Sequence, residues 1–190
     1  IARLPKGASI EPLLYGSYSS ISLGYIGLYE TCIAMKGVSN TDPIGKEFAM
    51  RVITHLRDTC TKWKEETNIG FSLYSTPAES LCYRFAKYDK EHFGNIEHIT
   101  DKGWYTNSYH VTPTENINAF DKLEFEAQFQ PIASGGHISY VEIPNLQNNL
   151  EAIREVVKYI YNHIQYAEFN TKSDYCQVCG FDGEIKVNEN

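Results

Sequence analysis

Six consecutive residues, from Ser75 to Ser80, have the types and spacing that begin a helix and could hold an anion there. Thr76 suits the N-cap position, Pro77 the first helical position and Glu79 the third, where its carboxylate would complete a capping box. A helix that begins directly after a strand presents free backbone N–H groups at the positive end of its dipole, and these favour phosphate. Most capping boxes only begin a helix, so the pattern by itself favours that plainer interpretation.

A second candidate site is the pair Cys176 and Cys179, which is followed directly by Gly180. Two thiolates at this spacing on a tight glycine turn are typical of a zinc knuckle. A tetrahedral site needs four ligands, and the eleven residues after Cys179 contain neither Cys nor His. Either His163 or a second pair beyond Asn190 would have to complete it. A redox pair is the competing interpretation and an unliganded pair is the third, but redox pairs usually lie at a helix start, so the terminal loop favours zinc.

Three further cysteines and one histidine carry weaker signals. Cys32, Cys60 and Cys82 fall on predicted helical faces, where buried structural thiols are the usual finding. His137 follows two glycines and precedes a predicted strand, so it could lie near a site, although a single histidine is more often structural. We therefore assign no chemistry to these four residues.

The elements that must position the two sites follow the order strand, helix, strand, helix. Alternating apolar side chains predict strands, and apolar side chains spaced by three and four predict helices. This order favours a parallel α/β arrangement. A change of character after Asn170 divides the chain into a main part, 1–170, and a small module, 171–190. The predicted strands cover 20–26, 69–73 and 138–143, the predicted helices cover 28–36, 43–63, 77–87, 116–129 and 146–164, and 90–115 is predicted to be irregular.

The composition is that of an ordinary soluble globular protein, with 42% hydrophobic and 22% charged residues among 190. No run approaches the roughly 20 apolar residues that cross a bilayer, and no signal-peptide pattern opens the chain. The net charge of −7 argues against general attraction to nucleic acid or to anionic membranes. The five scattered cysteines favour a reduced, cytoplasmic protein over a disulfide framework. Because the first residue is Ile1, we expect a fragment of a longer protein.

Five segments together resemble the anaerobic, glycyl-radical class of ribonucleoside-triphosphate reductase, in the C-terminal part of its large subunit. They occur in the order found in that family and span nearly the whole chain. The amino-acid sequence is most similar to that of the T-even bacteriophage members. The segments are Ile21–Leu28, Ser75–Cys82, Asp101–Ser108, Gly135–Ile138 and Cys176–Gly180.

The resemblance implies a fold, a site and a chemistry. The fold would be the second half of a ten-stranded α/β barrel, made of two five-stranded parallel halves, followed by the start of a zinc-binding and glycyl-radical module. The family reduces ribonucleoside triphosphates at the 2′ position, with formate as the reductant in the well-known members. The residues implied to bind the substrate phosphates are Ser75, Thr76, Ala78, Glu79 and Ser80.

The same resemblance implies a set of partners. An activating protein with an iron–sulfur cluster and S-adenosylmethionine makes the glycyl radical, which generates a cysteine thiyl radical. The full-length enzyme is expected to be a homodimer in the cytoplasm, or in the host cytoplasm for a viral protein, with no nucleic acid or membrane partner. Allosteric regulation belongs to the family through a nucleotide site upstream of Ile1.

The chain also departs from the full family pattern. The family zinc site uses two Cys-x-x-Cys pairs, and only Cys176 and Cys179 are present. The radical glycine lies in an Arg-x-Cys-Gly-Tyr-like motif that does not occur here, and the thiyl cysteine belongs upstream of Ile1. We therefore place no catalytic residue in this chain and expect the isolated chain to be inactive.

The residues also disfavour two alternative functions. A zinc-ribbon module that binds nucleic acid or protein is disfavoured by the acidic charge balance. A relative of the formate lyases is disfavoured by the terminal knuckle and by the Thr-Pro-Ala-Glu-Ser loop.

Overall fold

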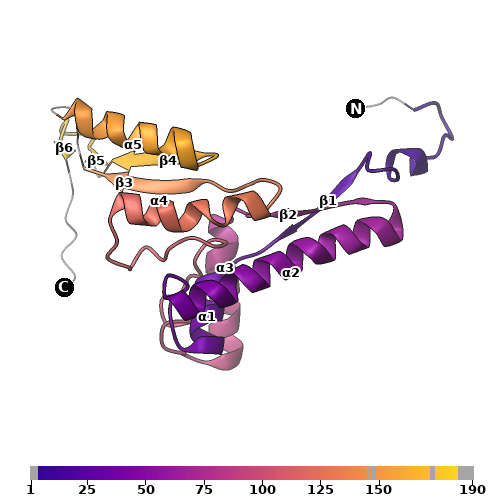
Figure 1. The fold of residues 1–190 in the computed structure, drawn as a ribbon, viewed down its shortest axis with the longest axis horizontal. Helices are drawn as coiled ribbons and strands as arrows, with labels where there is room; N and C mark the ends of the chain where they lie inside the picture. Colours follow the sequence, from indigo (N-terminus) through magenta and orange to yellow (C-terminus); the bar gives the residue numbers. More distant parts are fainter. Residues whose placement is uncertain (1–3, 145, 147–148, 172–173, 184–190) are drawn as a thin grey trace.

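A computed structural model describes residues 4–144, 146, 149–171 and 174–183. The chain is mixed α/β, as predicted, with strands that lie between helices (Figure 1). Among these residues no helix is long and apolar enough to span a membrane. The elements are η1 (Glu11–Leu13), β1 (Ser20–Gly24), α1 (Leu28–Lys36), α2 (Pro43–Thr67), β2 (Gly70–Tyr74), α3 (Glu79–Phe93), α4 (Ala119–Ala127), η2 (Gln130–Ile132), β3 (Ser139–Ile143), α5 (Leu150–His163), β4 (Ala167–Thr171), β5 (Asp174–Tyr175) and β6 (Asp182–Gly183).

Strands β1 and β2 form a parallel pair, and α1 and α2 make the crossover between them. The register pairs Ser20 with Gly70 and Gly24 with Tyr74, so both strands end at the same edge. A parallel pair needs such a long connection because the chain must return to the starting edge. The carboxyl ends of β1 and β2 therefore lie side by side.

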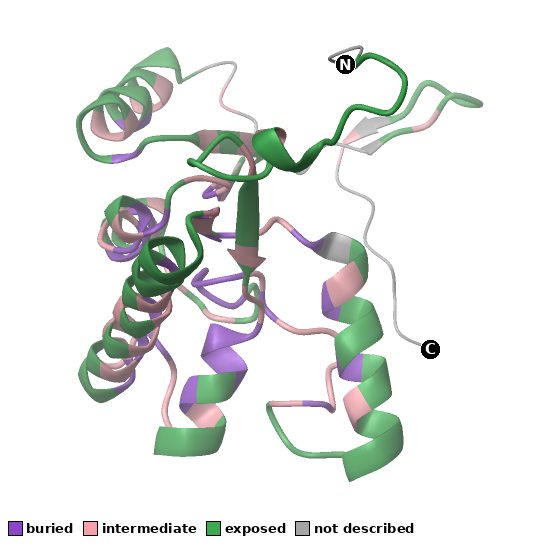
Figure 2. Cartoon of the chain, turned by 90° about the vertical axis from the view of Figure 1, so that its right-hand side faces the viewer, coloured by how far each residue is buried: buried purple, intermediate pink, exposed green. Residues whose placement is uncertain are grey.

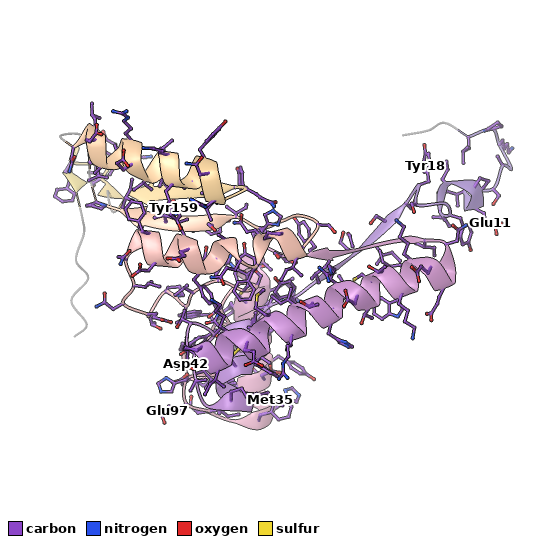
Figure 3. All side chains as sticks on the ribbon, in the orientation of Figure 1. Glu11, Tyr18, Met35, Asp42, Glu97 and Tyr159 are labelled. Atoms are coloured by element: carbon purple, nitrogen blue, oxygen red, sulfur yellow. The ribbon has the colours of Figure 1, made fainter. Side chains whose placement is uncertain are left out.

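Helix α2 begins where the sequence predicts, because the Asp42 side chain accepts a hydrogen bond from the Ile44 N–H at 2.9 Å. Figure 3 labels Asp42 at this helix start. The predicted apolar face is partly wrong, since Ile44 is 63% exposed while Gly45 and Ala49 are buried. A side chain at Gly45 would collide with the Ser39 backbone, so the closest packing uses the small residues.

Strands β3 and β4 form a second parallel pair, with α5 as the crossover. The sequence predicted β3 but not β4, whose residues Ala167–Thr171 alternate only weakly in polarity. The segment that leads into β3 also contacts β2, because Ser134 N–H donates to Leu73 O at 2.9 Å and Ser75 N–H donates to Gly135 O at 3.0 Å. The two parallel pairs are thus neighbours.

Two apolar clusters hold these layers together. The larger joins α1, α2 and β2 to the aromatic rings around Tyr109 and Phe129, and the smaller joins α4, α5, β3 and β4 around Leu123 and Val141. Tyr159 lies between α5 and α4, where its ring meets that of Phe120 with centroids 5.5 Å apart (Figure 3). Figure 2 shows the buried residues on the inward sides of the helices and an exposed N-terminal segment.

Candidate functional site

Helix α3 begins two residues later than predicted. Its first residue is Glu79 and its N-cap is Ala78, which offers no side-chain cap. The predicted cap, Thr76, instead donates its hydroxyl to Tyr74 O at 3.3 Å, so the capping role predicted for Thr76 is wrong. The side chain of Glu79, the other partner in the predicted capping box, lies outside what the structure describes.

Asn107 takes the place of the missing cap from a distant part of the chain. Its Oδ1 accepts the Ala78 N–H at 3.0 Å and the Cys82 thiol at 3.0 Å. Tyr105 N–H also donates to Cys82 O at 3.2 Å. The first turn of α3 is therefore attached to the loop 101–108 at three points.

The loop 101–108 is in turn attached to the segment between β1 and α1. Gly27 N–H donates to Thr106 O at 2.8 Å, and Leu28 N–H donates to Ser108 O at 3.3 Å. Ile26 and Asn107 form an isolated antiparallel bridge. Two segments that lie 79 to 81 residues apart in the sequence are thus hydrogen-bonded side by side.

A buried ion pair attaches the same loop to α1. Glu30 is 4% exposed, and its Oε1 accepts from Lys102 Nζ at 2.7 Å and from the N–H and hydroxyl of Thr106, each at 3.0 Å. The Lys102 ammonium also lies 4.6 Å from the ring centroid of Tyr29 and 4.4 Å from that of Trp104. A paired and hydrogen-bonded charge of this kind tolerates burial.

Ser75 is fully buried and is hydrogen-bonded to the residue after β1 and to the segment that leads into β3. Its hydroxyl lies 2.9 Å from the Tyr25 hydroxyl, and its N–H donates to Gly135 O. Burial raises the pKa of Tyr25, and the bond to Ser75 offsets this only in part, so Tyr25 stays protonated.

Two glycines allow the loop to approach the neighbouring segments closely. A side chain at Gly24 would overlap the Thr76 hydroxyl. A Cβ on Gly136 would lie 2.5 Å from the Tyr74 ring and 2.9 Å from Ser75 O, and the φ of +76° at Gly136 also favours glycine. Both contacts require the absence of a side chain.

A cavity of about 400 Å³ adjoins this assembly. A group of polar side chains lies beside it, in which the buried Glu126 Oε1 lies 3.2 Å from His110 Nδ1 and also contacts Lys122 Nζ. Burial alone raises the pKa of Glu126, but His110 and Lys122 lower it more, to about 2. The lining includes Cys82, Tyr105, Asn107, His110, Lys122 and Tyr140.

The cysteine pair lies in the turn of the β5–β6 hairpin. Cys176 N–H donates to Phe181 O at 2.9 Å, and Gly180, with φ of +72°, donates its N–H to Cys176 O at 2.8 Å. Backbone N–H groups of Cys179 and Val178 lower the pKa of Cys176, which favours the thiolate that binds metal. The turn fits two ligands of a zinc site. Within the described ranges no three His, Cys, Asp or Glu side chains converge on a metal position, so His163 does not complete it there.

The other cysteines and His137 are buried, as expected of structural residues. Cys32, Cys60 and Cys82 are buried and reduced. His137 is 8% exposed and its Nε2 is hydrogen-bonded to Gln165 Oε1.

The sequence alone indicated neither Asn107 nor the ion pair between Glu30 and Lys102 as part of the site. All three lie in or beside two of the segments that resemble the family, Asp101–Ser108 and Ile21–Leu28, but their spacing in sequence gives no sign that they meet. Lys122 and Glu126 did carry a signal, since they are four residues apart on one helix.

Residues 3–189 match the protein family described as anaerobic ribonucleoside-triphosphate reductase. The anaerobic ribonucleoside-triphosphate reductase of Haemophilus influenzae is 44% identical over 186 residues, which are 97% of this chain and 26% of that protein. The enzyme of the same name from Enterobacteria phage T4 is 43% identical over 188 residues, which are 99% of this chain and 30% of that protein. The chain thus spans less than a third of the length of these relatives.

Solved structures show the same fold. A structure described as anaerobic ribonucleotide reductase matches with a TM-score of 0.70 at 22% identity, over 86% of this chain and 28% of that one. The anaerobic ribonucleotide reductase from Thermotoga maritima, in complex with dATP and CTP, matches with a TM-score of 0.64 at 19% identity, over 86% of this chain and 29% of that one.

Proposed function

Because the chain belongs to the family of anaerobic ribonucleoside-triphosphate reductases, we propose that it forms part of such an enzyme and binds the phosphates of the ribonucleoside-triphosphate substrate. The binding segment is Ser75–Ser80, in which Thr76, Glu79 and Ser80 surround the phosphates and Ala78 fixes the start of the helix. Ser75 anchors this segment through its buried hydroxyl.

One observation carries this proposal. Four of the five segments that resemble the family meet around the start of α3, through Tyr25, Gly27, Asn107 and Gly135. The meeting point lies beyond the carboxyl ends of two parallel strands, which is where α/β proteins generally bind their ligands. A helix start at such a place favours phosphate, because its first N–H groups have no partner within the helix.

The remaining chemistry of the family is proposed to lie outside this chain. The reduction uses a glycyl radical and a cysteine thiyl radical, formate as the reductant, and an activating protein with an iron–sulfur cluster and S-adenosylmethionine. No residue of this chain is assigned a catalytic role. The full-length enzyme is proposed to be a homodimer.

We assign Cys176 and Cys179 to one half of a structural zinc site. The hairpin turn and the lowered pKa of Cys176 support this assignment. Zinc bound there would hold the hairpin to a second pair of ligands. A free-standing zinc-ribbon module is not favoured, because the family match spans residues 3–189 rather than the last twenty alone.

A charge placed in the first turn of α3 tests the phosphate assignment. Ser80 is exposed, and Ser80→Asp puts a carboxylate near the positive end of the helix dipole. That interaction is favourable, so stability should not fall. The same carboxylate repels substrate phosphates. In a full-length reductase that contains this segment, we expect the KM for the ribonucleoside triphosphate to rise about tenfold or more.

The matched control is Leu150→Asp, which puts the same charge in the first turn of α5 at a residue that is 72% exposed. This control should leave the KM unchanged. Equal KM values for Ser80→Asp and the unmodified enzyme would show that no phosphate lies at the start of α3.

A further inference from the structure

The amide oxygen of Asn107 lies within hydrogen-bonding distance of two donors on one turn of α3. It is 3.0 Å from Ala78 N and 3.0 Å from Cys82 Sγ. A backbone N–H can only donate, so the Asn107 oxygen, and not its nitrogen, must face the helix. From these contacts we infer that Asn107 is a positioning residue for the substrate-phosphate segment, an inference that rests on the function proposed above.

The spacing of the two donors explains why one side chain can fix the helix start. Ala78 and Cys82 are four residues apart and therefore lie one above the other on the same face. A bond to Ala78 N–H fixes where the helix begins along its axis. A second bond to the Cys82 thiol, one turn further on, fixes its rotation about that axis.

Asn107 can do this because its own position is fixed independently of α3. The bridge to Ile26 and the bond from Gly27 N–H to Thr106 O attach it to the segment after β1. Thr106 and Lys102 both donate to the Glu30 carboxylate, and these bonds attach it to α1. The start of α3 is thus located relative to β1 and α1.

The consequence for binding follows from the identity of the group that Asn107 engages. Ala78 N–H is the last backbone donor before the helix, and Asn107 satisfies it. The N–H groups that follow it in the first turn are then the donors that face a ligand. Substitution of Asn107 should let this turn fray and should spread the same donors over many orientations.

Two substitutions separate the hydrogen bond from the charge. Asn107→Ala removes the acceptor, so deuterium exchange of the amides of Ala78 and Cys82, which are both hydrogen-bonded, should become about tenfold faster. In a full-length reductase that contains this segment, the KM for the ribonucleoside triphosphate should rise about tenfold with a smaller change in kcat.

Asn107→Asp keeps an oxygen acceptor of the same shape and adds a negative charge beside the helix start. Exchange of the Ala78 and Cys82 amides should stay close to that of the unmodified protein, while the KM should rise at least as much as for Asn107→Ala. Asn162→Asp adds the same charge to the exposed face of α5 and should change neither quantity. A merely structural asparagine would not separate the two readouts in this way.

The outcomes distinguish failure of the inference from failure of the proposed function. Unchanged amide exchange in Asn107→Ala would overturn the positioning role, whatever the KM. Faster exchange in Asn107→Ala, together with an unchanged KM in both Asn107→Ala and Asn107→Asp, would leave Asn107 as a positioning residue and would overturn the phosphate role of the segment. If Asn107→Ala does not fold, Cys82→Ala decides, since it removes one of the two donors; it should accelerate exchange less than tenfold, and no acceleration would overturn the two-point contact.

Discussion

Replacing Lys102 by methionine would leave the buried carboxylate of Glu30 without the ammonium that lies 2.7 Å from it. Methionine keeps most of the apolar stem, so the change removes charge more than volume. Removal of one partner of a buried ion pair typically destabilises a protein by about 3–5 kcal/mol. Lys102 is 14% exposed and Glu30 keeps two hydrogen bonds from Thr106, so water and these donors partly offset the destabilisation. We expect the free energy of unfolding to fall by about 3 kcal/mol.

The assay is urea unfolding at pH 7, followed by circular dichroism, on the single variants and on the double variant. Glu30→Gln in the Lys102→Met background removes the unpaired buried charge and keeps an acceptor for Thr106. The double variant should therefore lose only about 1.5 kcal/mol, less than Lys102→Met alone.

The control is Lys62→Met, because Lys62 and Glu66 form an exposed pair at 3.6 Å with 70% and 54% of their side chains accessible. Its effect should be below about 0.5 kcal/mol. A loss in Lys102→Met as small as that of the control, or strictly additive effects in the double variant, would refute the reasoning that a buried charge is being stranded.

Three further predictions concern other parts of the site. Since the pKa of Glu126 is about 2 in the folded protein and 4.5 ordinarily, its contribution to stability should be complete above about pH 4.5 and should disappear as the pH falls toward 2; acid titration of Glu126→Gln should lack this component. Gly136→Ala should lower the free energy of unfolding by about 2 kcal/mol, whereas Gly135→Ala, with open space around it, should change it by less than about 1 kcal/mol in chemical denaturation. In the presence of a chelator that removes zinc, native protein should react rapidly with a thiol reagent only at Cys176 and Cys179, and denatured protein at all five cysteines; fast reaction of more than two thiols would contradict the burial of the others.

Local chemistry in the sequence predicted much of the fold. The aspartate and proline at the start of α2 and the glycine after α1 set the ends of those helices, and the structure confirms them because each end depends on residues within one turn. Strand β4 escaped prediction, because Ala167–Thr171 alternate weakly and are identified as a strand only by their pairing with β3.

The site was harder to predict, because its contacts join residues that are distant in the sequence. Thr76 and Glu79 form a local pattern for a helix cap. In the structure the side chain of Asn107, which is distant in sequence, accepts the Ala78 N–H, and the helix begins two residues later than predicted. Such a contact depends on how loops pack in three dimensions, and nothing in the spacing of residues 78 and 107 reports it. Local patterns therefore located the segment, and only the structure could show what fixes it.

Gly24 has a second consequence, for how the chain reaches its native pairing. Parallel strands so far apart in sequence must find one another without the guidance of a tight turn, and a shift of one residue would reverse the direction of every side chain. In a shifted alignment Leu23 or Tyr25 would occupy the place of Gly24, and its side chain would collide with the hydroxyl of Thr76. The glycine thus favours the native alignment over its neighbours, and we expect a larger residue there to destabilise this alignment as well as the finished loop.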